Sequence, residues 1–200
     1  MKPLIAIPVK PFGVAKARLE PVLDARQRSL LGKAIARRTI HEAQRTGARV
    51  AVVTRDRRVA RWASLLQAEV VTESIEYGSG LNGAAGAAAA HADHFGCNWM
   101  ILHADLPLVT SVDLEAAIDR FRPDGYVLAP SYDGGTSLLM GAGPFSFSYG
   151  KASFHRHLAA TGGRAEVIVR TGLALDLDTP RDLEAIERLG GSVMWHGVGG

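Results

Sequence analysis

The sequence predicts an α/β protein, a single domain built around a parallel β-sheet. A length of 200 residues suits one domain with one hydrophobic core. Short apolar segments alternate with longer segments whose apolar residues recur at helical spacing, and this order implies right-handed crossovers between parallel strands. Two strand-like segments end in aspartates, and ligands of open α/β sheets bind at the carboxyl ends of the strands.

The first half of the chain supplies most of this alternation. Residues 3–9 are apolar and predict the first strand. A long helix is predicted over 26–46, because Leu31 and Ile35 recur at helical spacing and Gly47 can end it. The elements expected next are a strand at 49–54, a helix at 57–67, a strand at 68–72, a polar loop at 73–80 and a helix of small residues at 81–90.

The second half continues with a strand over 99–104 that reaches Asp105 and is stopped by Pro107. A helix follows, with Thr110 or Ser111 as its cap. Further expected elements are strands at 125–130, 165–169 and 173–178, an apolar run from Thr136 to Met140, a helix ending near 161, and a last helix opening at 179 with a proline in its first turn. The domain is predicted to span 1–189, and 190–200 is expected to be a flexible tail in which Trp195 and His196 have no role.

Composition points to a soluble cytoplasmic protein. The formal charge is only +3 and the basic residues are not interleaved with aromatics, so nucleic acid is a poor candidate partner. Cys97 is the single cysteine, which excludes an internal disulfide and favours the cytosol. No apolar run is long enough to cross a bilayer, and the N-terminus has no signal-peptide pattern. The basic run from Arg55 to Arg61 is interpreted as a solvated helix face.

Three aspartates are the candidate catalytic centre. Asp105, Asp176 and Asp178 follow strand-like segments, and strand alternation would turn Asp176 and Asp178 to one face. Carboxylates gathered at one sheet edge would repel one another unless a cation held them, and Mg²⁺ prefers such ligands and shares its shell with substrate phosphates. The plainer alternative is that Asp105 only caps the turn before Pro107.

Basic residues follow the first strand. Lys10, Lys16 and Arg18 lie in the first strand-to-helix loop, where α/β folds commonly meet phosphates, and they are candidates to neutralise a polyphosphate or are simply surface charges. The loop is neither a P-loop nor a dinucleotide fingerprint. Asn82 has an amide suited to a base or ribose edge, although a helix N-cap explains it equally well.

Glycines and hydroxyl groups mark a second candidate anion site. Asp133-Gly-Gly comes directly before Thr136, where backbone could approach a ligand or a plain hairpin turn could form. Gly150 and Ser153 open a predicted helix whose free N–H groups could bind an anion, with Lys151 beside them. His155 and His157 are two apart and point to different sides of that helix, so they predict no metal pair.

Several motifs together resemble a known family. They are Ile7-Pro-Val-Lys-Pro-Phe12, Ala15-Lys-Ala-Arg-Leu19, Gly80-Leu-Asn82, Ala104-Asp-Leu-Pro-Leu108, Gly134-Gly-Thr136, Gly150-Lys-Ala-Ser-Phe154 with His157, and Asp176-Leu-Asp-Thr-Pro180 with Asp182-Leu183. In this order they resemble the phospholactate/phosphoenolpyruvate guanylyltransferases of deazaflavin coenzyme F-420 biosynthesis. Asp-Leu-Pro alone is shared by many nucleotidyltransferases, whereas the opening motif combined with Gly-Lys-Ala-Ser-Phe is far more specific.

The resemblance implies a nucleotide-diphospho-sugar transferase-like three-layer sandwich with a mostly parallel sheet. It also implies transfer of GMP from GTP to the phosphate of phosphoenolpyruvate, 2-phospho-L-lactate or 3-phosphoglycerate, with a later deazaflavin transferase consuming the product and a homodimer left open. The implied roles are Asp105, Asp176 and Asp178 for Mg²⁺; Thr136, Gly150 and Ser153 for the acid; Lys10, Lys16, Arg18 and Asn82 for the nucleotide; and Asp105, Lys16 and Arg18 for catalysis.

One departure from the family pattern and two rival interpretations remain. Gly83-Ala-Ala-Gly86 is smaller than the resemblance predicts, which could enlarge the acid pocket. A molybdopterin or sugar nucleotidyltransferase would share the fold, but would be expected to open with a glycine-rich loop that Pro8-Val-Lys-Pro11 replaces. A non-catalytic nucleotide-binding protein would be expected to lack one of the acids.

Overall fold

A seven-stranded mixed β-sheet forms the centre of the computed structural model, which describes residues 2–14 and 16–189. The strand order is β3-β2-β1-β4-β6-β5-β7. β6 runs antiparallel to β4 and β5, and the other neighbouring pairs are parallel. The strands are β1 (Leu4–Pro8), β2 (Arg49–Thr54), β3 (Glu69–Thr72), β4 (Trp99–Leu102), β5 (Tyr126–Pro130), β6 (Thr136–Gly141) and β7 (Ala165–Val167). The predicted α/β class and mostly parallel sheet are confirmed.

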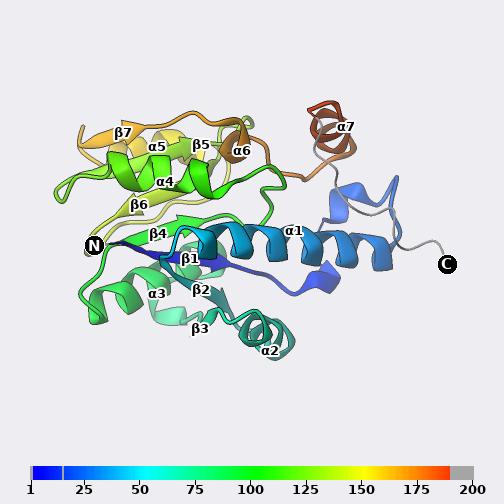
Figure 1. Cartoon of the computed structure of the whole chain (residues 1–200), viewed down its shortest axis with the longest axis horizontal. Coiled ribbons are helices and arrows are strands. Elements are labelled where there is room, and N and C mark those ends of the chain that lie inside the picture. Colours follow the sequence, from blue (N-terminus) through cyan, green and yellow to red (C-terminus); the bar gives the residue numbers. More distant parts are fainter. Residues whose placement is uncertain (1, 15, 190–200) are drawn as a thin grey trace.

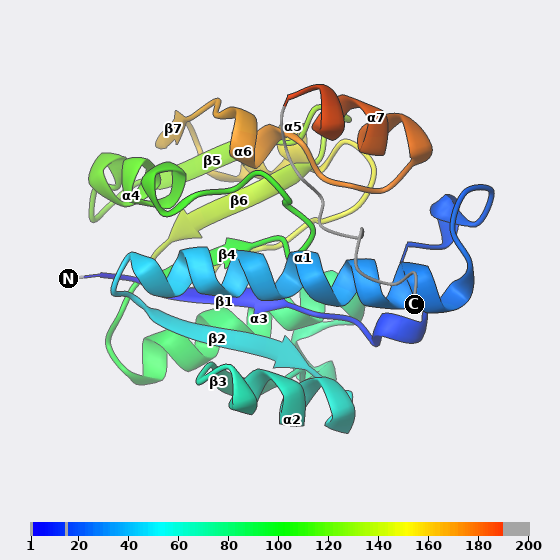
Figure 2. The same ribbon diagram turned by 45° about the vertical axis from the view of Figure 1, so that its right-hand side comes forward.

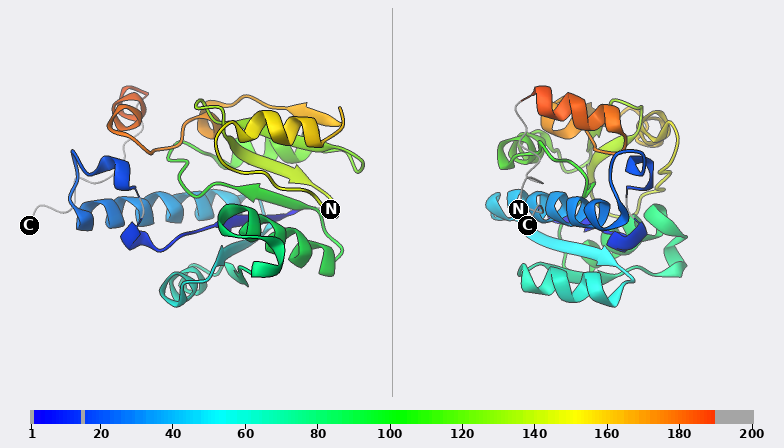
Figure 3. Two further views of the ribbon diagram at one scale, coloured as in Figure 1. Left: turned by 180° about the vertical axis from the view of Figure 1, so that it is seen from behind. Right: turned by 90° about the vertical axis from the view of Figure 1, so that its right-hand side faces the viewer.

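Helices cover both faces of the sheet (Figures 1 and 2). Those described are α1 (Ala25–Arg45), α2 (Arg57–Leu65), α3 (Gly80–His94), α4 (Ser111–Arg120), α5 (Ser153–Ala160), α6 (Thr171–Ala174) and α7 (Pro180–Arg188), with short 3-10 turns η1 (Phe12–Val14), η2 (Ala17–Leu19) and η3 (Ile75–Tyr77). Residues of α1, α2, α4 and α6 pack on one face, and residues of α3 and α5 pack on the other. Figure 3 shows α3 and α5 together on the face seen from behind.

Strand alternation divides the core between these two layers. In β1, Ile5 and Ile7 face the α1 side, whereas Leu4 and Ala6 face α3, and all four are fully buried. The run of alanines in α3 packs directly on the sheet, because small side chains allow the helix to lie close to it. A strand buried on both faces needs apolar residues at every position, which is why β1 and β4 are continuous apolar runs.

Local signals placed most helix ends correctly. Thr110 caps α4 and Thr179 caps α7, each in a capping box closed by an aspartate three residues later. Gly47 has φ +68° directly after the turn that ends α1, a conformation that suits glycine. Asp24 caps α1, which begins at Ala25, one residue before the predicted start of that helix.

The predicted strand at 173–178 is wrong. α6 occupies Thr171–Ala174, and the residues after it leave the helix without entering the sheet. The alternation of Leu173, Leu175 and Leu177 imitates a strand, but only Leu173 and Leu177 are fully buried, and they pack in different clusters. The strand-like alternation at 173–178 therefore reflects two leucines buried in separate clusters, not a strand.

Two further expectations concern the chain as a whole. None of the helices within the described ranges is long and apolar enough to span a membrane. The expected tail from residue 190, with Trp195 and His196, falls outside the residues that the structure describes.

Candidate active site

Asp105 lies at the carboxyl edge of the sheet, two residues beyond His103. The N–H of His103 donates to Ser137 O at 3.0 Å and so extends the pairing of β4 with β6. α1 supports this loop from one side. Thr39 Oγ1 donates to Ala104 O at 3.3 Å, and Arg38 donates to Pro107 O and Val109 O at 2.7 and 3.1 Å. Asp105 is thus held by contacts that the sequence did not reveal, because they join residues more than 60 positions apart.

The predicted convergence of the three aspartates is confirmed. One carboxylate oxygen from each of Asp105, Asp176 and Asp178 lies within 4.8 Å of the others. Because 175–178 is not a strand, the alternation expected to align Asp176 with Asp178 does not apply. The backbone joins the two segments instead, since Leu177 N donates to Asp105 O at 3.0 Å and the Leu177 side chain is fully buried.

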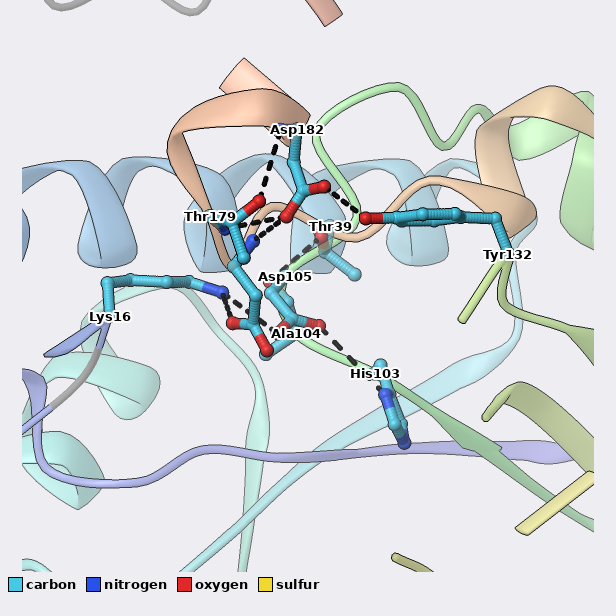
Figure 4. A network of polar contacts seen from close by, with 9 residues as sticks. Lys16, Thr39, His103, Ala104, Asp105, Tyr132, Thr179 and Asp182 are labelled. Atoms are coloured by element: carbon cyan, nitrogen blue, oxygen red, sulfur yellow. Dashed lines mark hydrogen bonds and ion pairs between the residues drawn. The ribbon is translucent and has the colours of Figure 1, made fainter. Parts of the chain in front are cut away.

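Lys16 places its ammonium group against two of these carboxylates (Figure 4). Lys16 Nζ lies 2.8 Å from Asp105 Oδ2 and 3.2 Å from Asp178 Oδ1, and the lysine side chain is only 7% exposed. Burial is the largest influence and lowers the pKa of Lys16, but the charges of Asp105 and Asp178 and their hydrogen bonds together raise it above its usual range. Lys16 is therefore fully charged at neutral pH. Its φ of 60° places a non-glycine residue in the left-handed region, a strain of the kind found at functional sites.

Negative charge still exceeds positive charge at this site. Burial raises the pKa of Asp105, but the Lys16 ammonium outweighs it and the net effect lowers the pKa. Asp176 has no such partner, so burial, followed by the charges of Asp105, Asp133 and Asp178, raises its pKa to about 7. When Asp176 is ionised, the three carboxylates and the Lys16 ammonium leave two negative charges, and oxygen donors at this spacing are what Mg²⁺ binds. The residues present therefore fit a divalent cation.

A tyrosine and a fourth aspartate support this centre, and the sequence analysis had assigned them no role. Asp182 Oδ2 accepts hydrogen bonds from Asp178 N at 2.9 Å and Thr179 N at 2.6 Å, and Asp182 Oδ1 accepts one from the Tyr132 hydroxyl. That hydrogen bond, then burial and the charges of Asp182 and Asp176, raises the pKa of Tyr132 to about 12. The Thr-Pro-x-Asp capping pattern marks Asp182 in the sequence, but nothing local marks Tyr132.

Two of the three residues predicted for the acid lie in one buried hydrogen-bonded chain. Ser153 Oγ donates to Thr136 Oγ1 at 3.2 Å, and Thr136 Oγ1 lies 2.9 Å from His157 Nδ1. His157 Nε2 accepts from Ser148 N at 2.9 Å, so Nε2 is unprotonated and Nδ1 carries the hydrogen that points to Thr136. Burial is the largest cause that lowers the pKa of His157 to about 4, and Arg156 and His103 contribute to the same shift. The His157 ring is therefore neutral at neutral pH.

Gly150, the third predicted acid residue, begins the turn before α5. Its φ is +123°, a conformation that suits glycine, and its carbonyl accepts from Ser153 N at 3.0 Å. The structure thus places Gly150 beside Ser153 and Thr136. The binding roles of all three residues stay predictions.

Asn82 connects α3 to the same loop. Its Oδ1 accepts a hydrogen bond from Tyr149 N at 2.6 Å, and the N-cap of α3 is Ser79, so the capping alternative for Asn82 is wrong. Lys10 and Arg18 are exposed on the segment that also carries Lys16. Contacts of Asn82, Lys10 and Arg18 with a nucleotide stay predictions.

Two buried polar atoms in the described part of the chain have no hydrogen-bond partner, His103 Nε2 and the Tyr149 hydroxyl. The two rings are neighbours, with centroids 5.5 Å apart, and His103 Nδ1 lies 4.0 Å from Asp105 Oδ1. Burial raises the pKa of Tyr149 and lowers that of His103, so both groups are neutral. The sequence analysis assigned neither residue a role.

The small residues Gly83 and Gly86 do not leave open space. A Cβ on Gly83 would lie 2.4 Å from Gly78 O, and a Cβ on Gly86 would lie 2.5 Å from Tyr77 Cβ. These glycines let the 74–80 segment pack tightly on α3. The space that a side chain would need at Gly83 and Gly86 is therefore taken by the backbone at Gly78 and by Tyr77, while the effect of these glycines on an acid pocket stays a prediction.

Comparisons with known proteins place the whole chain among relatives. A family described as "Guanylyl transferase CofC like" matches residues 3–199. The phosphoenolpyruvate guanylyltransferase of Rubrobacter xylanophilus is 34% identical, covering 96% of both chains. The 3-phospho-D-glycerate guanylyltransferase of Phenylobacterium zucineum is 37% identical over 87% of this chain and 84% of its own length. The 2-phospho-L-lactate guanylyltransferase of Methanosphaera stadtmanae is 28% identical over 98% of this chain and 85% of its own.

A solved structure confirms the fold class. It is the crystal structure of a protein from Desulfovibrio desulfuricans G20 described as a nucleotide-diphospho-sugar transferase. The TM-score is 0.78, the two sequences are 15% identical, and the match covers 98% of this chain and 91% of that one. At this identity the likeness concerns the fold alone.

Proposed function

Because the chain belongs to the CofC-like guanylyl transferase family, we propose that it transfers GMP from GTP to the phosphate of a three-carbon phospho-acid, releasing pyrophosphate, in coenzyme F-420 biosynthesis. The relatives named above act on phosphoenolpyruvate, 3-phospho-D-glycerate and 2-phospho-L-lactate, which share a phosphate and a carboxylate on three carbons. This shared chemistry defines the proposed acceptor class.

The observation that carries the proposal is the meeting of Asp105, Asp176 and Asp178 beside Lys16. The donor and acceptor are both highly anionic, so a catalyst must bring negative groups together and offset their repulsion. A Mg²⁺ ion bound by the three aspartates would supply positive charge to the phosphates and to the leaving pyrophosphate. This family membership favours guanylyl transfer over the sugar and molybdopterin alternatives.

The reaction requires the donor and the acceptor to be aligned, and it does not require a side-chain base. An oxygen of the acceptor's phosphate is already ionised at neutral pH and can attack the α-phosphorus of GTP directly. A bond forms between that oxygen and the α-phosphorus, while the bond from the α-phosphorus to the bridging oxygen of pyrophosphate breaks. Lys16, with Lys10 and Arg18 on the same segment, is proposed to pair with triphosphate oxygens and to position the α-phosphorus for in-line attack.

Lys16 has two roles in this proposal. With no nucleotide it pairs with Asp105 and Asp178, which limits the repulsion between the carboxylates. If a dication held by those carboxylates offset their charge, the ammonium group of Lys16 would be free to turn toward the phosphates. The position of Lys16 beside the three aspartates supports both roles.

The acid is proposed to bind near Thr136, Gly150 and Ser153. The hydroxyls of Thr136 and Ser153 carry two hydrogens, one of which lies between them. Thr136 Oγ1 already accepts from His157 Nδ1–H, so the second hydroxyl hydrogen remains available as a donor. A buried donor needs an acceptor oxygen, and an anionic substrate supplies one.

The test offers GTP, Mg²⁺ and each of the three acids in turn and follows pyrophosphate release. The purified deazaflavin transferase of the pathway is added to consume the unstable product. We expect release with at least one acid, with GTP preferred over CTP and ATP. Absence of release with all three acids, or equal release with every nucleotide, would contradict the proposal.

A further inference from the structure

The main chain that carries two of the three aspartates has little secondary structure to fix it. Residues 175–178 lie between α6 and the Thr179 cap of α7, outside the sheet. The hydrogen bond from Leu177 N to Asp105 O and the burial of Leu177 hold its middle. Its ends must be held by other groups if the carboxylates are to keep their spacing.

Asp182 holds the end that carries Asp178. One carboxylate oxygen, Oδ2, accepts the N–H groups of both Asp178 and Thr179. The other oxygen, Oδ1, accepts the Tyr132 hydroxyl. The orientation of this carboxylate therefore depends on the tyrosine, because two bonds through one oxygen leave the carboxylate free to swing about that oxygen.

Tyr132 also holds the other end. Its N–H donates to Ala174 O at 2.9 Å, so one residue contacts the chain on both sides of Asp176 and Asp178. Tyr132 itself is fixed by the turn between β5 and β6, where Asp133 Oδ1 accepts from Ser131 Oγ at 2.6 Å and from Gly135 N at 2.9 Å.

The exposure of Tyr132 separates a positioning role from a packing role. The residue is 59% exposed, so its ring contributes little to the core. Its hydroxyl nevertheless points at Asp182 rather than at solvent. The hydrogen bond from the Tyr132 hydroxyl to Asp182 therefore explains why an exposed tyrosine stands at this position.

We propose that Tyr132 is a positioning residue for the cation site, acting through Asp182 on the main chain of Asp178. The proposal rests on the proposed function only in taking the dication to be Mg²⁺ at Asp105, Asp176 and Asp178. Groups that orient metal ligands from outside commonly change metal affinity by about 10- to 100-fold when they are removed.

The test replaces Tyr132 by phenylalanine and measures cation binding directly. Mn²⁺ serves as the probe in the nucleotide-free protein, followed by electron paramagnetic resonance and calorimetry. We expect the dissociation constant to rise about tenfold while the midpoint of thermal unfolding in EDTA falls by no more than about 3 °C. In turnover, half-saturating Mg²⁺ should rise and the acceptor KM should stay within about twofold, since the acid groups are untouched.

Tyr77→Phe is the matched control, because Tyr77 is 46% exposed and its ring lies against Gly86 on α3. It should bind Mn²⁺ like the unmodified protein. Asp182→Asn completes a double-mutant cycle. If Tyr132 acts through Asp182, Tyr132→Phe should add little to the effect of Asp182→Asn.

Three outcomes would overturn the inference: unchanged Mn²⁺ affinity in Tyr132→Phe, full additivity with Asp182→Asn, or a large loss of thermal stability that accounts for the whole effect. If the unmodified protein transfers GMP but Tyr132→Phe binds Mn²⁺ normally, the inference fails and the proposed function stands. If the unmodified protein binds no Mn²⁺, the magnesium site and the inference fail together.

Discussion

At the scale of single residues, charge balance decides how the candidate site behaves. Lys16 lies between Asp105 and Asp178 although its backbone is in the left-handed region. Its ammonium group forms two ion pairs, with Asp105 and Asp178, that stabilise this conformation. The sequence analysis identified Lys16 as a cation for phosphate, but a partner 89 positions away cannot be read from local pattern.

Lys16→Met should have opposite effects on cation binding and on turnover. Removing the ammonium group unpairs two partly buried carboxylates, so the free energy of unfolding in EDTA should fall by about 1–2 kcal/mol. Mg²⁺ should then bind at least about tenfold more tightly, because a competing positive charge is gone. Pyrophosphate release should nevertheless fall by about a hundredfold. Lys33→Met, an exposed lysine of α1, is the control, and weaker Mg²⁺ binding in Lys16→Met would contradict the account.

His157 should make the fold sensitive to acid. Its folded pKa is about 4, below the ordinary value of 6.5, so between these values the unfolded chain binds a proton that the native chain does not. The free energy of unfolding should therefore fall as pH drops from about 6.5 to about 4, by up to roughly 3 kcal/mol.

Asp176 acts in the opposite direction over the same range, because its raised pKa contributes stability at low pH that is lost as pH rises through about 7. The measurement is therefore the difference in urea-unfolding free energy between the unmodified protein and His157→Gln as a function of pH. His155→Gln, at an exposed neighbouring position, is the control. A difference that does not change with pH would show that His157 does not cause this dependence.

At the scale of secondary-structure elements, sequence patterns predicted those strands and helix ends that are determined by interactions between nearby residues. Continuous apolar runs identified β1 and β4, and capping residues located α4 and α7. The same rules misread 173–178, since Leu173 and Leu177 are held by contacts with different layers rather than by a ladder. The sequence analysis named Asn82 but did not predict its contact, because Tyr149 lies on a loop 67 positions later.

Two substitutions of Asn82 separate its contact with the loop from its predicted contact with the nucleotide. Asn82→Asp keeps an oxygen for Tyr149 N but removes the amide donors, whereas Asn82→Leu removes both. If the amide binds the nucleoside, Asn82→Asp should raise the KM for GTP about tenfold and leave the acceptor KM within about twofold. Asn82→Leu should also lower thermal stability. An unchanged KM for GTP in Asn82→Asp would limit Asn82 to holding the loop.

At the scale of the whole molecule, the sheet collects residues from distant parts of the chain. The convergence of Asp105 with Asp176 and Asp178 was predicted correctly, but from two strand ends of which only the one before Asp105 exists. The segment of Asp176 and Asp178 is brought to the sheet edge by the hydrogen bond from Leu177 N to Asp105 O, which no local pattern predicts. The antiparallel direction of β6 was not predicted, because Asp133-Gly-Gly suits a hairpin turn and a ligand-binding turn equally well. The supporting residues Arg38, Thr39 and Tyr132 depend on this tertiary arrangement and have no local signature.

Asp105→Asn should abolish cation binding and turnover while leaving the fold intact. A saturating dication that binds only the native chain should raise the midpoint of thermal unfolding of the unmodified protein by about 5 °C. Asp105→Asn should keep its midpoint in EDTA, lose this shift, and release pyrophosphate at least about a hundredfold more slowly. Asp119→Asn, an exposed acid of α4, is the control. Magnesium-dependent turnover near the normal rate in Asp105→Asn would contradict the assignment.

The two hydroxyls and the one glycine proposed to bind the acid come from the start of β6, the turn before α5 and the first residue of α5, whereas the aspartates follow β4 and α6. The two groups therefore lie on different segments of the chain, and the turn that carries Tyr132 links them through Ala174 and Asp182. With this arrangement the acceptor would meet residues other than the three aspartates, and the similar proteins carry the names of three different acids.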